Sequence, residues 1–197
     1  MKLLARKDQI RMKAQTLFRE RGYSATSMRD LADSLGIEAA SLYNHISSKE
    51  EILQEICFSM ADSFFSAIEP VAESALEPKE KLRAATEAHL AVIAANSDAS
   101  AVFLHEWRHM GEPFLGDFKL MRRRYEQIFR KIIEDGILKE IFRNIDAAIA
   151  ARTLLSATNW TFESHKSLKS FASGGKLSTK ETSDLITTIL IEGIITR

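Results

Sequence analysis

Apolar residues recur every three or four positions along almost the whole chain, and this periodicity limits the possible folds more than any other feature of the sequence. Within residues 7–21, for example, Ile10, Ala14 and Leu17 fall on one face of a helix. The 3 prolines and 8 glycines stand between such segments, and no alternating run of β-branched residues separates them. The sequence therefore predicts an all-α fold of about nine helices.

Capping residues and helix breakers set the expected ends of these helices. Ser27 with Asp30, and Ser48 with Glu51, have the spacing of a capping box, in which the hydroxyl and the carboxylate each bind a first-turn amide. Gly136 is expected to end a late helix. The predicted helices span residues 7–21, 28–35, 39–45, 49–70, 78–95, 99–110, 113–135, 147–169 and 179–196.

Composition excludes several classes of protein. The 197 residues are 45% hydrophobic with a net charge of zero, so one or two packed domains are expected rather than a disordered chain. A single cysteine, Cys57, excludes a disulfide scaffold. Neither a secretory signal nor an apolar run of the roughly 20 residues that cross a bilayer is found, so we expect a cytoplasmic protein without a membrane partner.

Charge is unevenly distributed along the chain. Residues 1–50 carry nine Lys and Arg against six Asp and Glu, a net charge of +3. Such an end either binds a polyanion or is simply a solvated helix face. Lys2, Arg6 and Lys7 are candidates for contacts along a phosphate edge.

Two short predicted helices, 28–35 and 39–45, are joined by a turn at Gly36 and preceded by a longer helix. This arrangement presents the second short helix to the DNA major groove. Four sequence motifs in this region are specific: GYSATSMRDLA from Gly22, LGI from Leu35, SLYNHI from Ser41 and SKEEIL from Ser48. Residues 7–52 therefore resemble the helix-turn-helix domain of the TetR family of bacterial transcriptional regulators, and we expect this domain to comprise residues 1–52.

The resemblance implies a set of DNA-contacting residues in this chain. They are Ser27, Arg29, Ala39, Ala40, Ser41, Tyr43, Asn44, His45 and Lys49. In physical terms, Tyr43 and His45 can donate hydrogen bonds to phosphate oxygens, and Ser41 can reach a base edge. Ala39 and Ala40 can pack on thymine methyl groups.

Lys49 would bind phosphate at a helix N-terminus, where the helix dipole also favours an anion. Two positions depart from the family pattern. Glu38 replaces the usual Ser or Thr at a capping position, and we interpret it as a cap turned away from DNA. Asn44 replaces an aromatic residue and could read adenine. In the alternative interpretation, Tyr43 is a core aromatic, and His45 and Lys49 are ordinary surface groups.

For residues 53–197 the resemblance implies a ligand-binding and dimerisation domain. Family members usually dimerise through the last two helices, here 147–169 and 179–196. The last helix supports this independently, because its apolar residues occupy more than one face and a helix apolar on two faces needs two partners. These residues are Leu185, Ile186, Ile189, Leu190, Ile191, Ile194 and Ile195.

The segments FLHEWRHM from Phe103, RRRYE from Arg122 and LSATNWTF from Leu155 resemble an acyl-CoA-responsive branch of the family, which controls fatty-acid or steroid catabolism. An acyl chain needs an apolar tunnel and CoA phosphates need cations. The expected ligand-binding residues are Phe103, Trp107, Arg108, Arg124, Tyr125, Asn159, Trp160 and Phe162. Alternatively the aromatic residues are core, and the arginines are a solvated patch. The branch pattern breaks at Glu163.

We therefore expect a homodimeric regulator that binds double-stranded operator DNA, most simply a repressor released by a small apolar effector such as an acyl-CoA or fatty acid. The alternative is a constitutive or architectural dimeric DNA-binding protein without an effector. An enzyme using Ser156 or Cys57 as nucleophile is not expected, because no base and orienting acid accompany them. No catalytic residue, cofactor or metal is expected. His105 and His109 are one turn apart, but Glu106 lies on another helix face.

Overall fold

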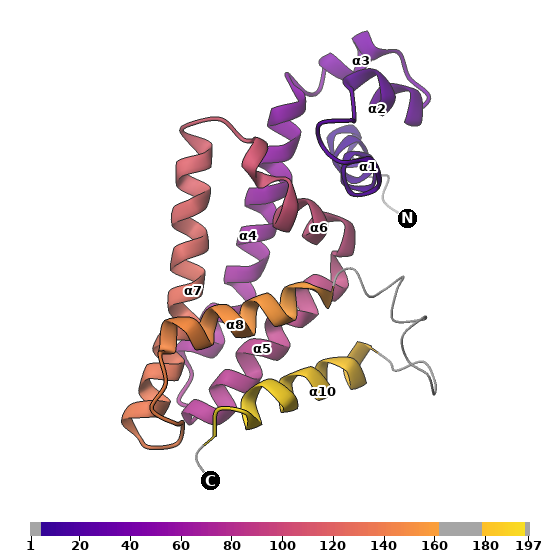
Figure 1. Cartoon of the computed structure of the whole chain (residues 1–197). Helices are drawn as coiled ribbons and strands as arrows, with labels where there is room; N and C mark the ends of the chain where they lie inside the picture. The colour runs from indigo at the N-terminus through magenta and orange to yellow at the C-terminus, as the bar shows by residue number, and fades with distance from the viewer. Residues whose placement is uncertain (1–4, 162–178, 196–197) are drawn as a thin grey trace. The chain divides into compact units, whose positions relative to one another are not determined.

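The computed structural model describes residues 5–161 and 179–195 (Figure 1). In this part of the chain every regular element is a helix, which confirms the all-α prediction. The helices are α1 (Arg6–Arg21), α2 (Met28–Ser34), α3 (Ala39–Tyr43), α4 (Lys49–Glu73), α5 (Pro78–Ala95), α6 (Ser97–His105), the 3₁₀ helix η1 (Trp107–His109), α7 (Phe114–Leu138), α8 (Ala147–Asn159) and α10 (Thr179–Glu192). None of the described helices combines the length and apolar composition that crossing a bilayer requires.

Two compact units make up the chain, and each is assembled from two stretches. Unit 1 comprises Met1–Ala61 and Asp98–Lys119, and unit 2 comprises Asp62–Ser97 and Leu120–Arg197. The three helices of the helix-turn-helix therefore share a unit with α6, η1 and the first turn of α7. The boundary predicted at residue 52 remains a prediction.

The core of unit 1 is built from the apolar positions that the periodicity assigned to helix interiors. Phe18 of α1, Leu31 of α2 and Leu42 of α3 are at most 1% exposed, and Ile52 and Ile56 of α4 are fully buried. Burying each such side chain contributes about 1.5–3 kcal/mol. These buried residues hold α2 and α3 against α1 and α4.

The core of unit 2 lies where the C-terminal part of α4 meets α5, α7, α8 and α10. Both α8 and α10 contact α5, as Figure 1 shows. The buried members of this core are Ile68, Leu82, Ala85, Phe129, Ile132, Ile133, Phe142, Ala147, Ala151, Leu154 and Ile191. Asp146 begins α8 by accepting hydrogen bonds from the backbone amides of Ala148 and Ile149, at 2.8 and 2.9 Å.

Several predicted helix ends were wrong. The third helix ends at Tyr43 rather than at residue 45, α6 begins at Ser97, and α8 ends at Asn159. The predicted continuation of α8 to residue 169 falls mostly on residues 162–178, outside the described residues. Likewise, α7 passes through Gly136 and ends at Leu138.

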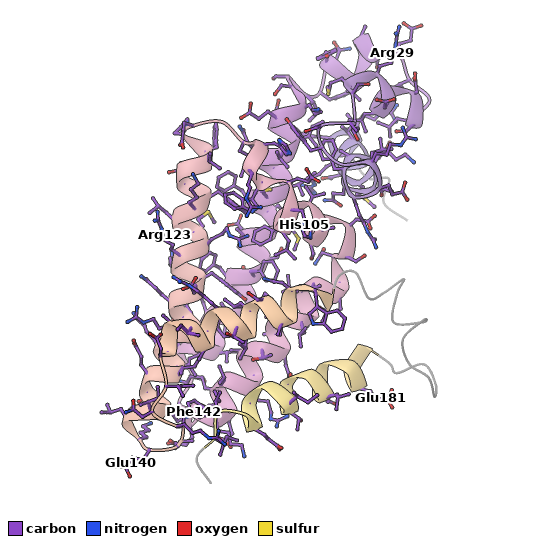
Figure 2. The ribbon with its side chains drawn as sticks, viewed as in Figure 1. Arg29, His105, Arg123, Glu140, Phe142 and Glu181 are labelled. Atoms are coloured by element: carbon purple, nitrogen blue, oxygen red, sulfur yellow. The ribbon has the colours of Figure 1, made fainter. Side chains whose placement is uncertain are left out.

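Gly136 serves close packing and does not end its helix. A Cβ atom at this position would lie 2.1 Å from Cδ2 of Phe142. Phe142, which is labelled in Figure 2, is buried. The carbonyl of Gly136 also accepts hydrogen bonds from the amides of Ile141 and Phe142, at 2.9 and 3.0 Å. The glycine lets the segment after α7 fold back onto the helix.

Candidate functional site

The second helix of the helix-turn-helix begins at a reciprocal cap. The amide of Asp30 donates to Oγ of Ser27 at 3.1 Å, and the amide of Ser27 donates to Oδ2 of Asp30 at 2.7 Å. This confirms the predicted capping box. The hydrogen bond from the Ser27 hydroxyl, more than any other contact, lowers the pKa of Asp30. The Ser27 side chain therefore takes part in this cap. Its predicted contact with DNA remains a prediction.

Helix α3 is held by a single buried residue and exposes most of its surface. Leu42 is fully buried, whereas Ala40, Ser41 and Tyr43 are exposed. Tyr43 is 54% exposed, which excludes the alternative in which it is a core aromatic. Ala39 is half-buried.

Asn44 and His45 follow α3 and are exposed. Glu38 occupies the N-cap position of α3 and its side chain makes no capping hydrogen bond. Arg29 is exposed on α2 (Figure 2) and makes no ion pair within the described residues. The six predicted residues of the α3 segment thus follow one another along a single short stretch of chain.

Lys49 has an intramolecular role that the sequence did not indicate. Its ammonium group donates to the backbone carbonyls of Tyr23 and Thr26, both at 2.9 Å, and lies 4.2 Å from the centre of the Tyr23 ring. These contacts tie the start of α4 to the α1–α2 turn. The predicted phosphate contact of Lys49 remains a prediction, and it would have to use the third hydrogen of the ammonium group.

Most other cations of this region are also paired. Lys7 binds Glu51 and Glu55 of α4, and the hydrogen bond with Glu55 is the largest cause that raises the pKa of Lys7. Arg11 pairs with Asp8 at 2.9 Å. The positive charge at the N-terminal end therefore holds α1 in place, in addition to any interaction with DNA. Lys2 lies outside the described residues.

Within unit 1, residues 98–111 bind the helix-turn-helix region through several side chains. Asp98 forms an ion pair with Arg19 and accepts a hydrogen bond from the hydroxyl of Thr16 at 2.9 Å. His109 stacks on Tyr23 with ring centroids 5.1 Å apart. Sequence reasoning missed these links. Matching charges on distant helices carry no signal in a single sequence.

The predicted ligand-binding residues fall in both units. In unit 1, the rings of Phe103 and Trp107 pack on buried Phe118 at centroid distances of 5.2 and 5.7 Å. The guanidinium of Arg108 lies 4.6 Å from the centre of the Trp107 ring. These three residues form one aromatic and cationic cluster around the η1 turn.

In unit 2, Arg124 pairs with Glu69 at 2.8 Å and lies over the ring of Phe65. Trp160 is 45% exposed. Phe162 lies outside the described residues. The remaining two predicted residues, Tyr125 and Asn159, are brought together by a residue that the sequence analysis did not assign to this site.

That residue is His89 of α5, which is 3% exposed. Its Nδ1 lies 3.1 Å from the hydroxyl of Tyr125, and its Nε2 lies 3.1 Å from Oδ1 of Asn159. Burial lowers the pKa of His89 to about 4 and raises the pKa of Tyr125. The sequence signal that could have indicated His89 was a histidine at an interior position of an amphipathic helix. That signal does not identify Tyr125 and Asn159 as its partners. Among the described residues, no three His, Cys, Asp or Glu side chains gather as a metal site would require.

The outer surfaces of α8 and α10 carry apolar side chains. Ile149 of α8 is 64% exposed, and Leu185 and Ile189 of α10 are 51% and 63% exposed. Thr187 and Ile191 of α10 are buried in the same unit. Helix α10 is thus apolar both on its buried side and on its exposed side. The side chains of Ile186 and Leu190 lie outside the described set.

Family models match both the N-terminal and the C-terminal part of the chain. A family model described as "Bacterial regulatory proteins, tetR family" matches residues 10–56, and one described as "Tetracyclin repressor-like, C-terminal domain" matches residues 75–194. The HTH-type transcriptional repressor KstR2 of Mycolicibacterium smegmatis is 28% identical over 192 residues, which cover 96% of this chain and 91% of that protein.

Two solved structures share this fold. The TetR family transcriptional regulator PfmR from Thermus thermophilus is 33% identical, with a TM-score of 0.79 over 94% of this chain and 98% of its own. AibR, solved in complex with isovaleryl coenzyme A and operator DNA, is 23% identical, with a TM-score of 0.80 over 95% of this chain and 98% of its own.

Proposed function

Since the chain belongs to the TetR family of bacterial transcriptional regulators, and its class is therefore a DNA-binding regulator rather than an enzyme, we propose that it is a homodimeric repressor. In this proposal, residues 1–52 bind operator DNA and residues 53–197 dimerise and bind a small apolar effector of the acyl-CoA type. Effector binding releases the repressor from its operator. The protein would act in the cytoplasm, where its operator lies.

The observation that carries the proposal is the exposed surface of α3. A short helix held by one buried leucine exposes Ala40, Ser41 and Tyr43, and this combination has no role in the core of the protein. Hydroxyl and methyl groups of this kind suit phosphate oxygens and base edges in a major groove. Asn44, His45 and Arg29 would extend the same contact surface.

Dimerisation is supported by the exposed apolar side chains of α8 and α10. A second copy of the chain, packed on Ile149, Leu185 and Ile189, would remove them from water and form a four-helix bundle. The proposed interface comprises residues 147–169 and 179–196. Two copies would place two α3 helices on successive half-sites of one operator.

The effector class is supported by relatives rather than by a bound ligand. KstR2 is a transcriptional repressor, and AibR binds isovaleryl coenzyme A as well as operator DNA. The candidate contact residues proposed from the sequence are Phe103, Trp107 and Arg108 in unit 1, and Arg124, Tyr125 and Trp160 in unit 2. Asn159 and Phe162 complete the proposed set. The alternative of a constitutive DNA-binding protein is not favoured, because AibR is solved with isovaleryl coenzyme A as well as operator DNA.

The test is to select duplexes that bind the purified chain from a random DNA pool, and then to add acyl-CoAs to the selected complex. We expect a palindromic consensus and release of the DNA by at least one acyl-CoA. Enrichment of no sequence would contradict the repressor proposal. A consensus whose binding no acyl-CoA changes would contradict only the effector class.

A further inference from the structure

The core of unit 2 contains a continuous polar chain that joins three helices. It runs from the hydroxyl of Tyr125 on α7, through the ring of His89 on α5, to Oδ1 of Asn159, the last residue of α8. Both hydrogen bonds are 3.1 Å long. Each nitrogen of a buried imidazole is thus bound by a side chain from a different helix.

These partners fix which ring nitrogen carries the hydrogen. An amide oxygen only accepts hydrogen bonds, so Nε2 of His89 must donate to Asn159. Nδ1 then accepts the hydrogen of the Tyr125 hydroxyl. Because burial lowers the pKa of His89 to about 4, the ring is neutral at neutral pH. The His89 ring therefore presents an N–H donor, and no positive charge, to Asn159 at the end of α8.

Aromatic rings surround this donor on its other sides. Phe64 stacks on the His89 ring at a centroid distance of 4.9 Å, and Phe129 approaches it edge-on at 6.2 Å. A polar group in such surroundings destabilises the fold unless it is hydrogen-bonded, and an apolar side chain would fill the same space without that requirement. A role besides packing would account for a histidine at this position.

The partner of the donor lies at a helix end and is not fully buried. Asn159 is half-buried, it is the last residue of α8, and the next residue, Trp160, is 45% exposed. A hydrogen bond to the end of a helix is broken with less rearrangement than one between two helix interiors. Asn159 thus contacts the buried donor and is itself partly exposed to solvent.

We propose that the Nε2–H of His89 recognises a neutral carbonyl group of the effector, and that this carbonyl replaces the side-chain oxygen of Asn159. The assignment rests on the proposed function, because it places a specific contact within the effector-binding part of the chain. The replacing group has to be an acceptor, since it takes the position of an amide oxygen. A carboxylate is disfavoured, because a neutral ring cannot compensate its buried charge. A thioester or ketone fits, and a free fatty acid does not.

The experiment compares two ligands that differ in the carbonyl alone. Isothermal titration calorimetry of the full chain with dodecanoyl-CoA and with S-dodecyl-CoA, a thioether without the carbonyl oxygen, gives the two dissociation constants. We expect dodecanoyl-CoA to bind about tenfold more tightly, the effect of one buried hydrogen bond. His89→Phe keeps a ring stacked on Phe64 but removes the donor, so the two ligands should bind it equally.

Thr86→Val is the matched control variant. Thr86 is buried one turn earlier on α5, and its hydroxyl donates to the carbonyl of Leu82 within the same helix. This variant should keep the tenfold preference. A preference that persists in His89→Phe, or equal binding of both ligands by the unmodified chain, would overturn the assignment of His89 while leaving acyl-CoA as the effector class. Binding of neither ligand would overturn the effector class and this assignment together.

Discussion

Tyr43 tests the proposed DNA surface at the scale of a single residue. Its ring is 54% exposed, so Tyr43→Ala should leave the free energy of unfolding nearly unchanged. Loss of a phosphate contact in both subunits should weaken operator binding at least several-fold, as fluorescence anisotropy of a labelled operator would measure. Unchanged affinity in the folded variant would refute the placement of α3 on DNA.

The histidine in the core of unit 2 makes stability depend on pH. The pKa of His89 falls from 6.5 to about 4 on folding. Between these values the unfolded chain binds a proton that the folded chain does not, so the contribution of neutral His89 is fully present above pH 6.5 and is lost as the pH falls toward 4. The slope reaches about 1.4 kcal/mol per pH unit.

Replacing His89 by phenylalanine should remove this dependence. Urea denaturation at about pH 7, 6 and 5 would give the difference in free energy of unfolding between the unmodified chain and His89→Phe. As the pH falls, we expect the free energy of unfolding of the unmodified chain to decrease relative to that of His89→Phe. A difference that stays constant over this range would mean that the folded-state pKa of His89 is not depressed.

Among whole elements, the end of α7 gives the sharpest test of packing. Gly136→Ala would place a Cβ atom against the ring of Phe142, at 2.1 Å in the present geometry. We expect a loss of about 1–3 kcal/mol in the free energy of unfolding, despite the better helix propensity of alanine. Introducing Phe142→Leu first should reduce the loss, because the ring is gone. An equal loss in both backgrounds would exclude the steric explanation.

The same element shows what a sequence can and cannot predict about helices. Periodicity and capping placed α1, α2 and α5 within about a residue or two of their observed ends, because caps act locally. Gly136 was misread because its need for a small side chain comes from Phe142, beyond the end of the helix. The intramolecular contacts of Lys49 and Asp98 were not predicted for a similar reason, since their partners lie far away in the sequence.

At the scale of the whole molecule, the fold class was predicted from the short-range apolar periodicity, and the surface of α3 was implied by the resemblance to the TetR family. The sequence did not predict the chain of hydrogen bonds through His89, which depends on how α5, α7 and α8 pack. Likewise, the net charge of +3 in residues 1–50 suggested a polyanion partner. In the structure most of these cations also form contacts within unit 1, so we expect neutral donors, Arg29 and dimerisation to contribute to DNA affinity as well.

Dimerisation is a further property on which operator binding should depend. Ile189→Lys alters a side chain that is 63% exposed in the single chain, so the subunit should stay folded. Burying the new ammonium group in the interface would be unfavourable, and sedimentation velocity should show a monomer that no longer binds operator DNA. Leu138→Lys is the matched control, since Leu138 is 83% exposed on α7, outside the proposed interface, and this variant should stay dimeric. A dimeric Ile189→Lys variant would exclude α10 from the interface.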